Sequence, residues 1–173
     1  MNPLAALYGA AVRARNELYD RGALMLSHLQ GPVISIGNLT VGGSGKTPFL
    51  MLLGESLKEL SIPFDVLSRG YRRKTTGVMV VDPLGSSREY GDEPLLIARK
   101  LGVPVIVGED RYAAGRLAEE RAGARLHLLD DGFQHRRLAR EFDIVLATPG
   151  EAQDSLLPTG RLREPIFSLS RAD

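Results

Sequence analysis

The sequence contains no cysteine among its 173 residues. The chain therefore forms no disulfides and offers no thiolate to a metal ion, which is typical of a protein from a reducing compartment such as the cytosol. An excess of one charge is also lacking, because 22 basic and 21 acidic residues leave a formal net charge of +1. This balance does not indicate a nucleic-acid partner, and any binding of anions has to be local.

Long hydrophobic runs are absent as well. No apolar stretch reaches the roughly 20 residues that a membrane-spanning helix needs, and the N-terminus lacks the basic start and compact apolar run of a signal peptide. Membrane contact is therefore expected only at the periphery. The chain does contain 43% hydrophobic residues, which is enough for the core of one globular domain.

Residues 1–30 carry apolar side chains at helical spacing, which predicts a long amphipathic helix with a break at Gly22. The residues in this stripe are Leu4, Leu7, Tyr8, Ala11, Val12, Leu18, Tyr19, Met25, Leu26 and Leu29. Two interpretations stay open: the stripe packs on the protein's own core, or it docks on a membrane surface. Three arginines in the segment favour membrane docking, whereas Glu17 and Asp20 oppose it.

From residue 31 to residue 173 short apolar runs alternate with helical stretches, the pattern of βα units around a mainly parallel sheet. We expect strands at Val33–Ile36, Phe64–Leu67, Val78–Val81, Val103–Val107, Leu126–Leu129 and Ile144–Ala147, and helices at Thr47–Leu60, Glu93–Leu101 and Tyr112–Ala122. The stretch Leu156–Asp173 shows no closing element. The predicted fold is therefore an α/β, P-loop NTPase-like core that stops before a second domain.

A glycine-rich loop follows the first predicted strand. The run Val33–Thr47, VISIGNLTVGGSGKT, places strand, loop and helix start in the order that a phosphate-binding P-loop requires. Gly42, Gly43 and Gly45 allow backbone N–H groups to turn toward phosphate oxygens, and the positive end of the helix dipole adds to the attraction. This loop predicts a site for the phosphates of ATP.

Side chains of the same loop supply the charge and the metal ligand. Lys46 brings a mobile positive charge, and the hydroxyl of Thr47 suits Mg²⁺. Thr40 stands where the general pattern has its first glycine. The residues expected to bind ATP are Thr40, Val41, Gly42, Gly43, Ser44, Gly45, Lys46 and Thr47.

An acidic motif follows the predicted strand Leu126–Leu129. Asp130 and Asp131 lie at its carboxyl end, where ligands of open α/β sheets gather, and either could hold Mg²⁺ between phosphates. Gln134 and His135 are within reach of the same cluster. The alternative is a structural Asp-Gly turn that closes a buried strand.

Asp92 and Glu93 begin a predicted helix. Asp92 is either the N-cap of that helix, with Glu93 as a favourable first-turn charge, or the group that accepts the proton of an attacking hydroxyl.

Two basic groups follow other strands. Arg69 begins a loop that also carries Arg72, Arg73 and Lys74, and Arg111 follows the fourth strand. Each either binds phosphate or an anionic substrate, or is an ordinary surface charge or local ion pair.

Several motifs occur in an order that resembles the tetraacyldisaccharide 4′-kinase (lipid A 4′-kinase) family. They are Gly37–Pro48 (GNLTVGGSGKTP), Ser68–Tyr71 (SRGY), Gly91–Pro94 (GDEP), Glu109–Arg111 (EDR), Asp130–His135 (DDGFQH) and Leu157–Pro165 (LPTGRLREP). The resemblance extends over nearly the whole chain, and a threonine at position 40 is typical of the family. Members of this family are considerably longer, which agrees with a truncated chain.

The resemblance implies transfer of the ATP γ-phosphate to the 4′-hydroxyl of a tetraacylated glucosamine disaccharide 1-phosphate, giving lipid IVA in lipid A biosynthesis. This reaction takes place at the cytosolic face of the bacterial inner membrane, where the first helix would dock. The roles implied are catalytic for Asp92, Lys46, His135 and Asp131, metal-binding for Thr47, Asp130 and Asp131, and supporting for Glu93 and Gln134. The alternatives are a P-loop ATPase or GTPase switch without a lipid acceptor, and an inactive fragment that only binds nucleotide.

Overall fold

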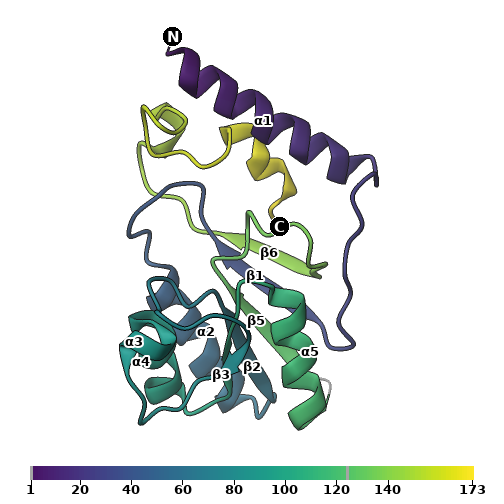
Figure 1. Cartoon of the computed structure of the whole chain (residues 1–173), viewed down its shortest axis with the longest axis vertical. Coiled ribbons are helices and arrows are strands. Elements are labelled where there is room, and N and C mark those ends of the chain that lie inside the picture. Colours follow the sequence, from purple (N-terminus) through teal and green to yellow (C-terminus); the bar gives the residue numbers. More distant parts are fainter. Residues whose placement is uncertain (1, 124) are drawn as a thin grey trace.

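The computed structural model describes residues 2–123 and 125–173, and Met1 of the expected segment 1–30 lies outside them. One six-stranded sheet forms the centre of the fold (Figure 1). Its strands are β1 (Val33–Gly37), β2 (Phe64–Ser68), β3 (Met79–Val80), β4 (Val105–Val107), β5 (Leu126–Asp130) and β6 (Phe142–Val145). The helices are α1 (Pro3–Asp20), α2 (Lys46–Glu59), α3 (Ser87–Tyr90), α4 (Asp92–Leu101) and α5 (Arg111–Ala122), with short 3₁₀ helices η1 (Glu151–Gln153) and η2 (Ile166–Arg171).

The strand order is β3-β4-β2-β5-β1-β6, and every pair is parallel except the antiparallel pair of β3 and β4. The expected mainly parallel α/β sheet is therefore confirmed. Ile36 of β1 pairs with Asp130 of β5, so the loop after β1 and the acidic motif after β5 leave the sheet side by side. This register brings the two predicted halves of the phosphate site together.

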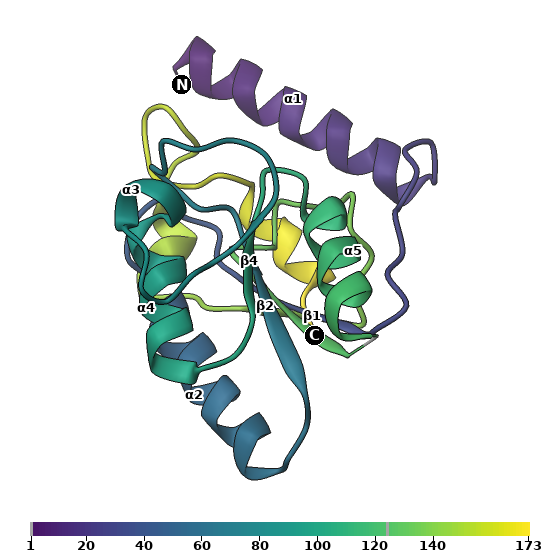
Figure 2. The same cartoon turned by 60° about the horizontal axis from the view of Figure 1, so that its bottom comes forward.

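Helices cover both faces of the sheet (Figure 2). Side chains alternate along the strands. Ile36, Val66 and Leu128 pack under α2 and α4, whereas Leu67 and Leu129 pack under α5. Both faces are buried, as a parallel sheet requires, and this double layer fixes the ends of the strands that carry the site.

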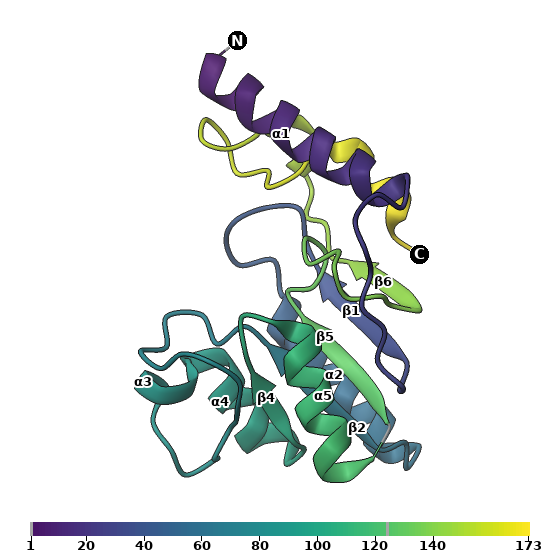
Figure 3. The ribbon, with the colours of Figure 1, turned by 45° about the vertical axis from the view of Figure 1, so that its right-hand side comes forward.

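Helix α1 is shorter than the predicted segment and packs differently from a core helix. It ends at Asp20 because Gly22 adopts a positive φ of 68°, and the chain then runs as an extended segment in which Ser27 pairs with Leu138. The helix lies beside the final segment of the chain (Figure 3). Leu4 and Leu7 remain 62% and 69% exposed.

The attachment of α1 is largely polar. Asn16 is buried and donates to a carboxylate oxygen of Glu164 over 2.7 Å, and the Tyr8 hydroxyl donates to the carbonyl of Arg163. Within the described residues, none of the helices is both long and apolar enough to span a membrane.

Several element boundaries differ from the sequence-based expectation. The last strand begins and ends two residues earlier than Ile144–Ala147 because Ile34–Gly37 of β1 pairs with 142–145. The final stretch is not without structure, since η2 lies there. Asp92 is not a helix cap: Gly91 is the N-cap of α4, with a φ of 91°, and Asp92 is the first helical residue.

Candidate active site

A cavity of about 690 Å³ lies at the carboxyl edge of the sheet. Its lining comes from α1 (Tyr8, Val12, Arg15), the P-loop and α2 (Val41, Gly42, Lys46), the ends of β2 and β5 (Ser68, Arg69, Tyr71, Asp130, Asp131, Gln134), α4 (Glu93) and the final segment (Leu157, Arg163, Glu164). The predicted phosphate loop and acidic motif therefore share one cavity, and α1 forms part of its wall.

The loop between β1 and α2 has the open backbone that phosphate binding needs. Gly42 and Gly45 have φ values of 119° and 80°, which side chains rarely tolerate. A Cβ atom built on Gly42, Gly43 or Gly45 meets nothing within 4 Å, so the glycines face open space. No side chain caps the start of α2 at Gly45. The helix N-terminus is left available to an anion.

Lys46 is held on three sides. Its Nζ donates to Asn38 Oδ1 over 3.0 Å and to Ser44 Oγ over 3.4 Å, and lies 3.5 Å from Asp131 Oδ1. The side chain is 12% exposed. The ammonium group is therefore fixed at the cavity wall, where it can bind a phosphate oxygen. Thr47 follows in the first turn of α2 and is half-buried.

Asp131 lies between two cations. Arg163 donates to its Oδ2 over 2.8 Å, while Lys46 approaches the other oxygen. Burial alone would raise the pKa of Asp131, but these two cations outweigh it and hold the pKa below its usual range. The residue has a φ of 52°, a left-handed conformation that aspartate adopts more readily than most residues. Asp131 is therefore ionised and is held in place by the turn.

Asp130 has the opposite electrostatic environment. It is 3% exposed and accepts a hydrogen bond from Ser68 Oγ over 2.9 Å. Burial, with the nearby charges of Asp131 and Glu93, raises its pKa to about 6 against the opposing effects of Ser68 and Lys46. A bound divalent cation would relieve this repulsion and keep both carboxylates ionised.

The residues present fit a magnesium ion held jointly with phosphate. Among residues 2–123 and 125–173, no cluster of three or more His, Asp or Glu side chains could hold a metal by itself. Mg²⁺ in nucleotide sites commonly takes only one or two carboxylates, with water and phosphate completing its shell. The donor set of Asp130, Asp131 and Thr47 matches that requirement.

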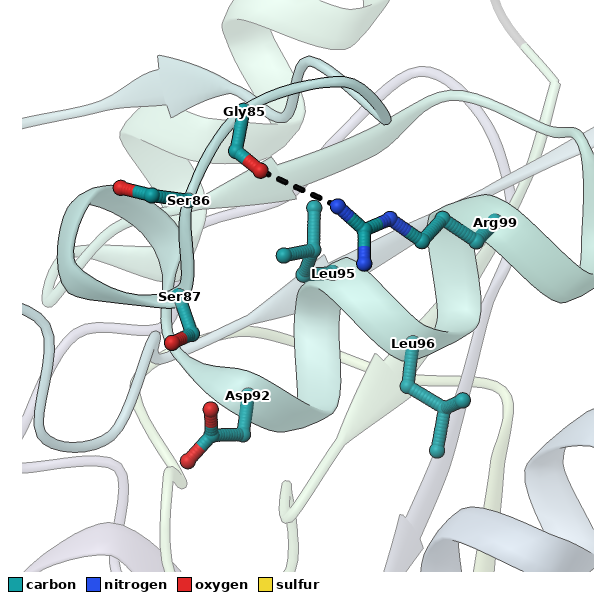
Figure 4. Close-up of a pocket in the computed structure, with 7 residues that line it drawn as sticks. All are labelled: Gly85, Ser86, Ser87, Asp92, Leu95, Leu96 and Arg99. Carbon is teal, nitrogen blue, oxygen red and sulfur yellow. Dashed lines mark hydrogen bonds between the residues drawn. The ribbon is translucent and has the colours of Figure 1, made fainter.

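The structure separates Asp92 from Glu93. Glu93 lines the large cavity, whereas Asp92 is exposed and lines a smaller hollow of about 300 Å³ between the start of α3 and α4 (Figure 4). In that hollow the guanidinium group of Arg99 donates hydrogen bonds to the carbonyls of Pro83 and Gly85. The expected proton acceptor is Asp92 and Glu93 is expected to support it, but of the two only Glu93 lines the large cavity.

The other predicted residues lie around the cavity with different surroundings. Arg69 is exposed at its rim, and Gln134 lines it while donating to the carbonyl of Asn38 over 2.9 Å. Arg111 is buried and donates to the carbonyl of Glu109, and its charge acts on both Asp130 and Asp131.

His135 does not line the cavity. Burial, with the nearby arginines Arg111 and Arg140, lowers its pKa to about 4. The imidazole is therefore neutral at pH 7.

Sequence reasoning assigned no role to Arg163, Glu164 or Asn38. Arg163 contacts Asp131 across 32 positions of the chain, and Asn38 contacts Lys46 from the start of the phosphate loop. Asn38 lies inside the motif Gly37–Pro48 and Arg163 inside Leu157–Pro165, and that position is the signal that could have marked them. Their partners became visible only with the fold.

Comparison with known proteins identifies relatives over the full chain. The family model described as tetraacyldisaccharide-1-P 4′-kinase matches residues 1–173. The tetraacyldisaccharide 4′-kinase of Koribacter versatilis is 58% identical over 99% of this chain and 56% of its own length. The enzyme of the same name from Aquifex aeolicus is 47% identical over 99% of this chain and 55% of its own length.

A solved structure matches equally well. A crystal structure of LpxK from Aquifex aeolicus, described as an apo form in complex with ATP, superimposes with a TM-score of 0.93 at 46% identity. The match covers 99% of this chain and 55% of that one. The chain therefore spans about half the length of the curated relatives it matches.

Proposed function

Because the chain belongs to the tetraacyldisaccharide-1-P 4′-kinase family, we propose that it binds Mg·ATP in the large cavity and transfers the γ-phosphate to the 4′-hydroxyl of an acylated glucosamine disaccharide 1-phosphate. The observation that carries this proposal is the shared cavity. The phosphate loop with Lys46 and the two aspartates forms one wall, and Tyr8, Val12 and Arg15 of α1 form another. A nucleotide and an amphipathic acceptor would meet there.

Electrostatic stabilisation of the transition state would make the main contribution to catalysis. Phosphoryl transfer passes through a loose transition state whose charge spreads over the transferred group, so catalysis depends on positioned cations. Lys46 would neutralise phosphate oxygens, and Asp130, Asp131 and Thr47 would hold Mg²⁺. When bound, Mg²⁺ would act as a Lewis acid that neutralises charge on the phosphate oxygens.

Arg163 would add a second positive charge at the cavity wall. It already contacts Asp131 and lines the cavity, so a phosphate oxygen can take the place of that carboxylate partner. Arg69 at the rim and Arg111 behind the two aspartates would raise the local positive potential further.

The acceptor hydroxyl needs a group that takes its proton. We assign this role to Asp92, with Glu93 supporting charge and position at the start of α4. Asp92 is exposed in the small hollow, so its carboxylate would have to turn toward the acceptor when the acceptor binds, whereas its neighbour Glu93 already lines the large cavity. Neutral His135 would support the turn after Asp131, where its backbone N–H donates to the carbonyl of Gly132.

We also infer peripheral membrane contact through α1, at the cytosolic face of the bacterial inner membrane. Leu4, Leu7 and Leu18 are exposed on a helix that is bonded to the core mainly through polar groups, which leaves its apolar residues available to lipid. This arrangement favours membrane docking over the core-packing interpretation.

The test follows labelled γ-phosphate from Mg·ATP onto tetraacyldisaccharide 1-phosphate in mixed micelles. We expect transfer by the chain, its loss in Lys46→Ala and Asp92→Ala, and full retention in the control Lys58→Ala, which changes an exposed lysine of the same helix. ATP hydrolysis that is independent of the acceptor would contradict the kinase and favour a nucleotide switch. Retained nucleotide binding without transfer would show that this half-length chain is not a catalyst by itself.

A further inference from the structure

A buried polar chain runs away from Lys46 beneath the phosphate loop. Lys46 Nζ lies 3.0 Å from Asn38 Oδ1, Asn38 Nδ2 lies 3.2 Å from Thr40 Oγ1, and Thr40 Oγ1 lies 3.0 Å from Glu151 Oε1. Asn38, Thr40 and Glu151 are 0%, 4% and 3% exposed. None of the three lines the cavity, so the chain of hydrogen bonds lies behind the site.

The chemistry of the two ends fixes the direction of every bond. An ammonium group only donates, so the oxygen of Asn38 must face Lys46, and its amide nitrogen then donates to Thr40. The Thr40 hydroxyl therefore gives its own hydrogen to Glu151, which accepts as a carboxylate. The arrangement joins a buried negative charge to the P-loop lysine through two neutral groups.

The same segment is tied down by its backbone. Val41 N donates to the carbonyl of Arg161, and Arg163 N donates to the carbonyl of Leu39. Thr40 is thus held between Glu151 on its side-chain face and the segment that carries Arg163 on its backbone. A glycine at position 40 would keep the backbone bonds and lose both side-chain bonds, the one from Asn38 and the one to Glu151.

We propose that Asn38, Thr40 and Glu151 are positioning residues that aim the ammonium group of Lys46 into the cavity, an inference that rests on the proposed nucleotide site. Asp131 draws Lys46 toward the acidic motif from 3.5 Å. Thr40 and Glu151 hold Asn38 in one orientation. The Asn38 side-chain oxygen therefore keeps its hydrogen bond to Lys46 and prevents the ammonium group from moving to Asp131. The threonine at the first glycine position of the loop therefore has a function, because its hydroxyl helps to hold Lys46 in position.

The experiment compares Thr40→Val, which keeps the shape but removes the hydroxyl, with Thr40→Ser, which keeps the hydroxyl. Thr148→Val is the matched control, because Thr148 donates to the same oxygen of Glu151 but lies off the route to Lys46. Two quantities are measured: the Kd of Mg·ATP, and the rate at which acetic anhydride acetylates Lys46 relative to Lys58 in the nucleotide-free protein. Thermal unfolding checks that each variant is folded.

We expect Thr40→Val to weaken Mg·ATP binding by about tenfold and to raise the relative acetylation rate of Lys46 several-fold, whereas Thr40→Ser and Thr148→Val stay within about twofold of wild type. The acetylation measurement needs no nucleotide. If the wild type does not bind Mg·ATP but Lys46 acetylation still follows this pattern, the proposed function fails and the positioning role stands.

Unchanged acetylation and unchanged binding in folded Thr40→Val would overturn the positioning role. Equal effects in Thr40→Val and Thr40→Ser would also overturn it, because only the loss of the hydroxyl should matter. If Thr40→Val does not fold, Glu151→Gln replaces it. That variant removes the negative end of the chain with little change in shape, and it should shift both quantities in the same direction.

Discussion

His127→Leu should lower the free energy of unfolding by about 3 to 5 kcal/mol, the range for removing one partner of a buried ion pair. His127 is fully buried in β5, with Nδ1 2.8 Å from Asp65 Oδ1 and Nε2 3.5 Å from Glu119 Oε1. The leucine would leave two buried carboxylates without their shared cation. Glu119 also accepts from the backbone of Gln30 and Gly31, so the loss would loosen the segment between α1 and β1.

The pKa values of Asp65 and His127 are both raised above their ordinary values. Burial raises the pKa of Asp65 more than His127 lowers it. Burial lowers the pKa of His127, but Asp65 and Glu119 outweigh this effect and raise it. Because both folded-state pKa values are raised, the pair stabilises the fold most at low pH, and its contribution falls as pH rises through the raised pKa of His127.

Chemical denaturation at several pH values measures the effect of His127→Leu. The control is His28→Leu, the same change at an exposed histidine, which should shift the unfolding free energy by less than about 0.5 kcal/mol. Adding Asp65→Asn to His127→Leu should recover part of the loss by removing one unpaired carboxylate. A loss below about 1 kcal/mol in His127→Leu would contradict a buried ion pair at this position.

Asp130→Asn should stabilise the protein above pH 6 by about 2 to 3 kcal/mol while weakening Mg·ATP binding. The folded state keeps a proton on Asp130 up to about pH 6, whereas an unfolded chain releases it near pH 4. The unfolding free energy of the wild type therefore falls as pH rises between these values. An amide carries no such charge, so the two proteins should converge below about pH 4 and separate above pH 6.

The measurement is the difference in unfolding free energy between Asp130→Asn and wild type across this pH range. His135, whose pKa is lowered to about 4, loses stabilisation as pH falls, but it is present in both proteins and cancels in the difference. Asp82→Asn, at an exposed carboxylate, is the control and should show no such separation. A difference that is the same at every pH would rule out the raised pKa as its cause.

The sequence predicted the parts of the fold that depend on local pattern. Strand, glycine-rich loop and helix at 33–59 form where periodicity and turn chemistry placed them, and the parallel sheet brings Asp130 beside the loop. The helix predicted through Leu29 is wrong beyond Asp20. Leu29 continued the apolar stripe in sequence, but in the structure it packs against Gly115 of α5, a contact that helical periodicity cannot reveal.

The residues of the candidate site likewise fall into those that the sequence predicted and those that only the fold revealed. Lys46, Thr47 and the two aspartates belong to motifs whose chemistry is local. The contacts of Arg163 with Asp131, and of Glu151 with Thr40, join residues far apart in the chain, so only tertiary packing reveals them. Whether Asp92 or Glu93 enters the cavity depends on the rotation of α4 about its axis, which the position of Gly91 as N-cap sets.

Binding of Mg·ATP in the large cavity is most directly tested by backbone hydrogen exchange with and without the nucleotide. The amides of residues 42–47 should exchange more slowly once Mg·ATP is added, in wild type and in Lys58→Ala, and this protection should be lost in Lys46→Ala. Protection confined to the small hollow at residues 85–99, or no protection of residues 42–47 at saturating nucleotide, would contradict the proposed site.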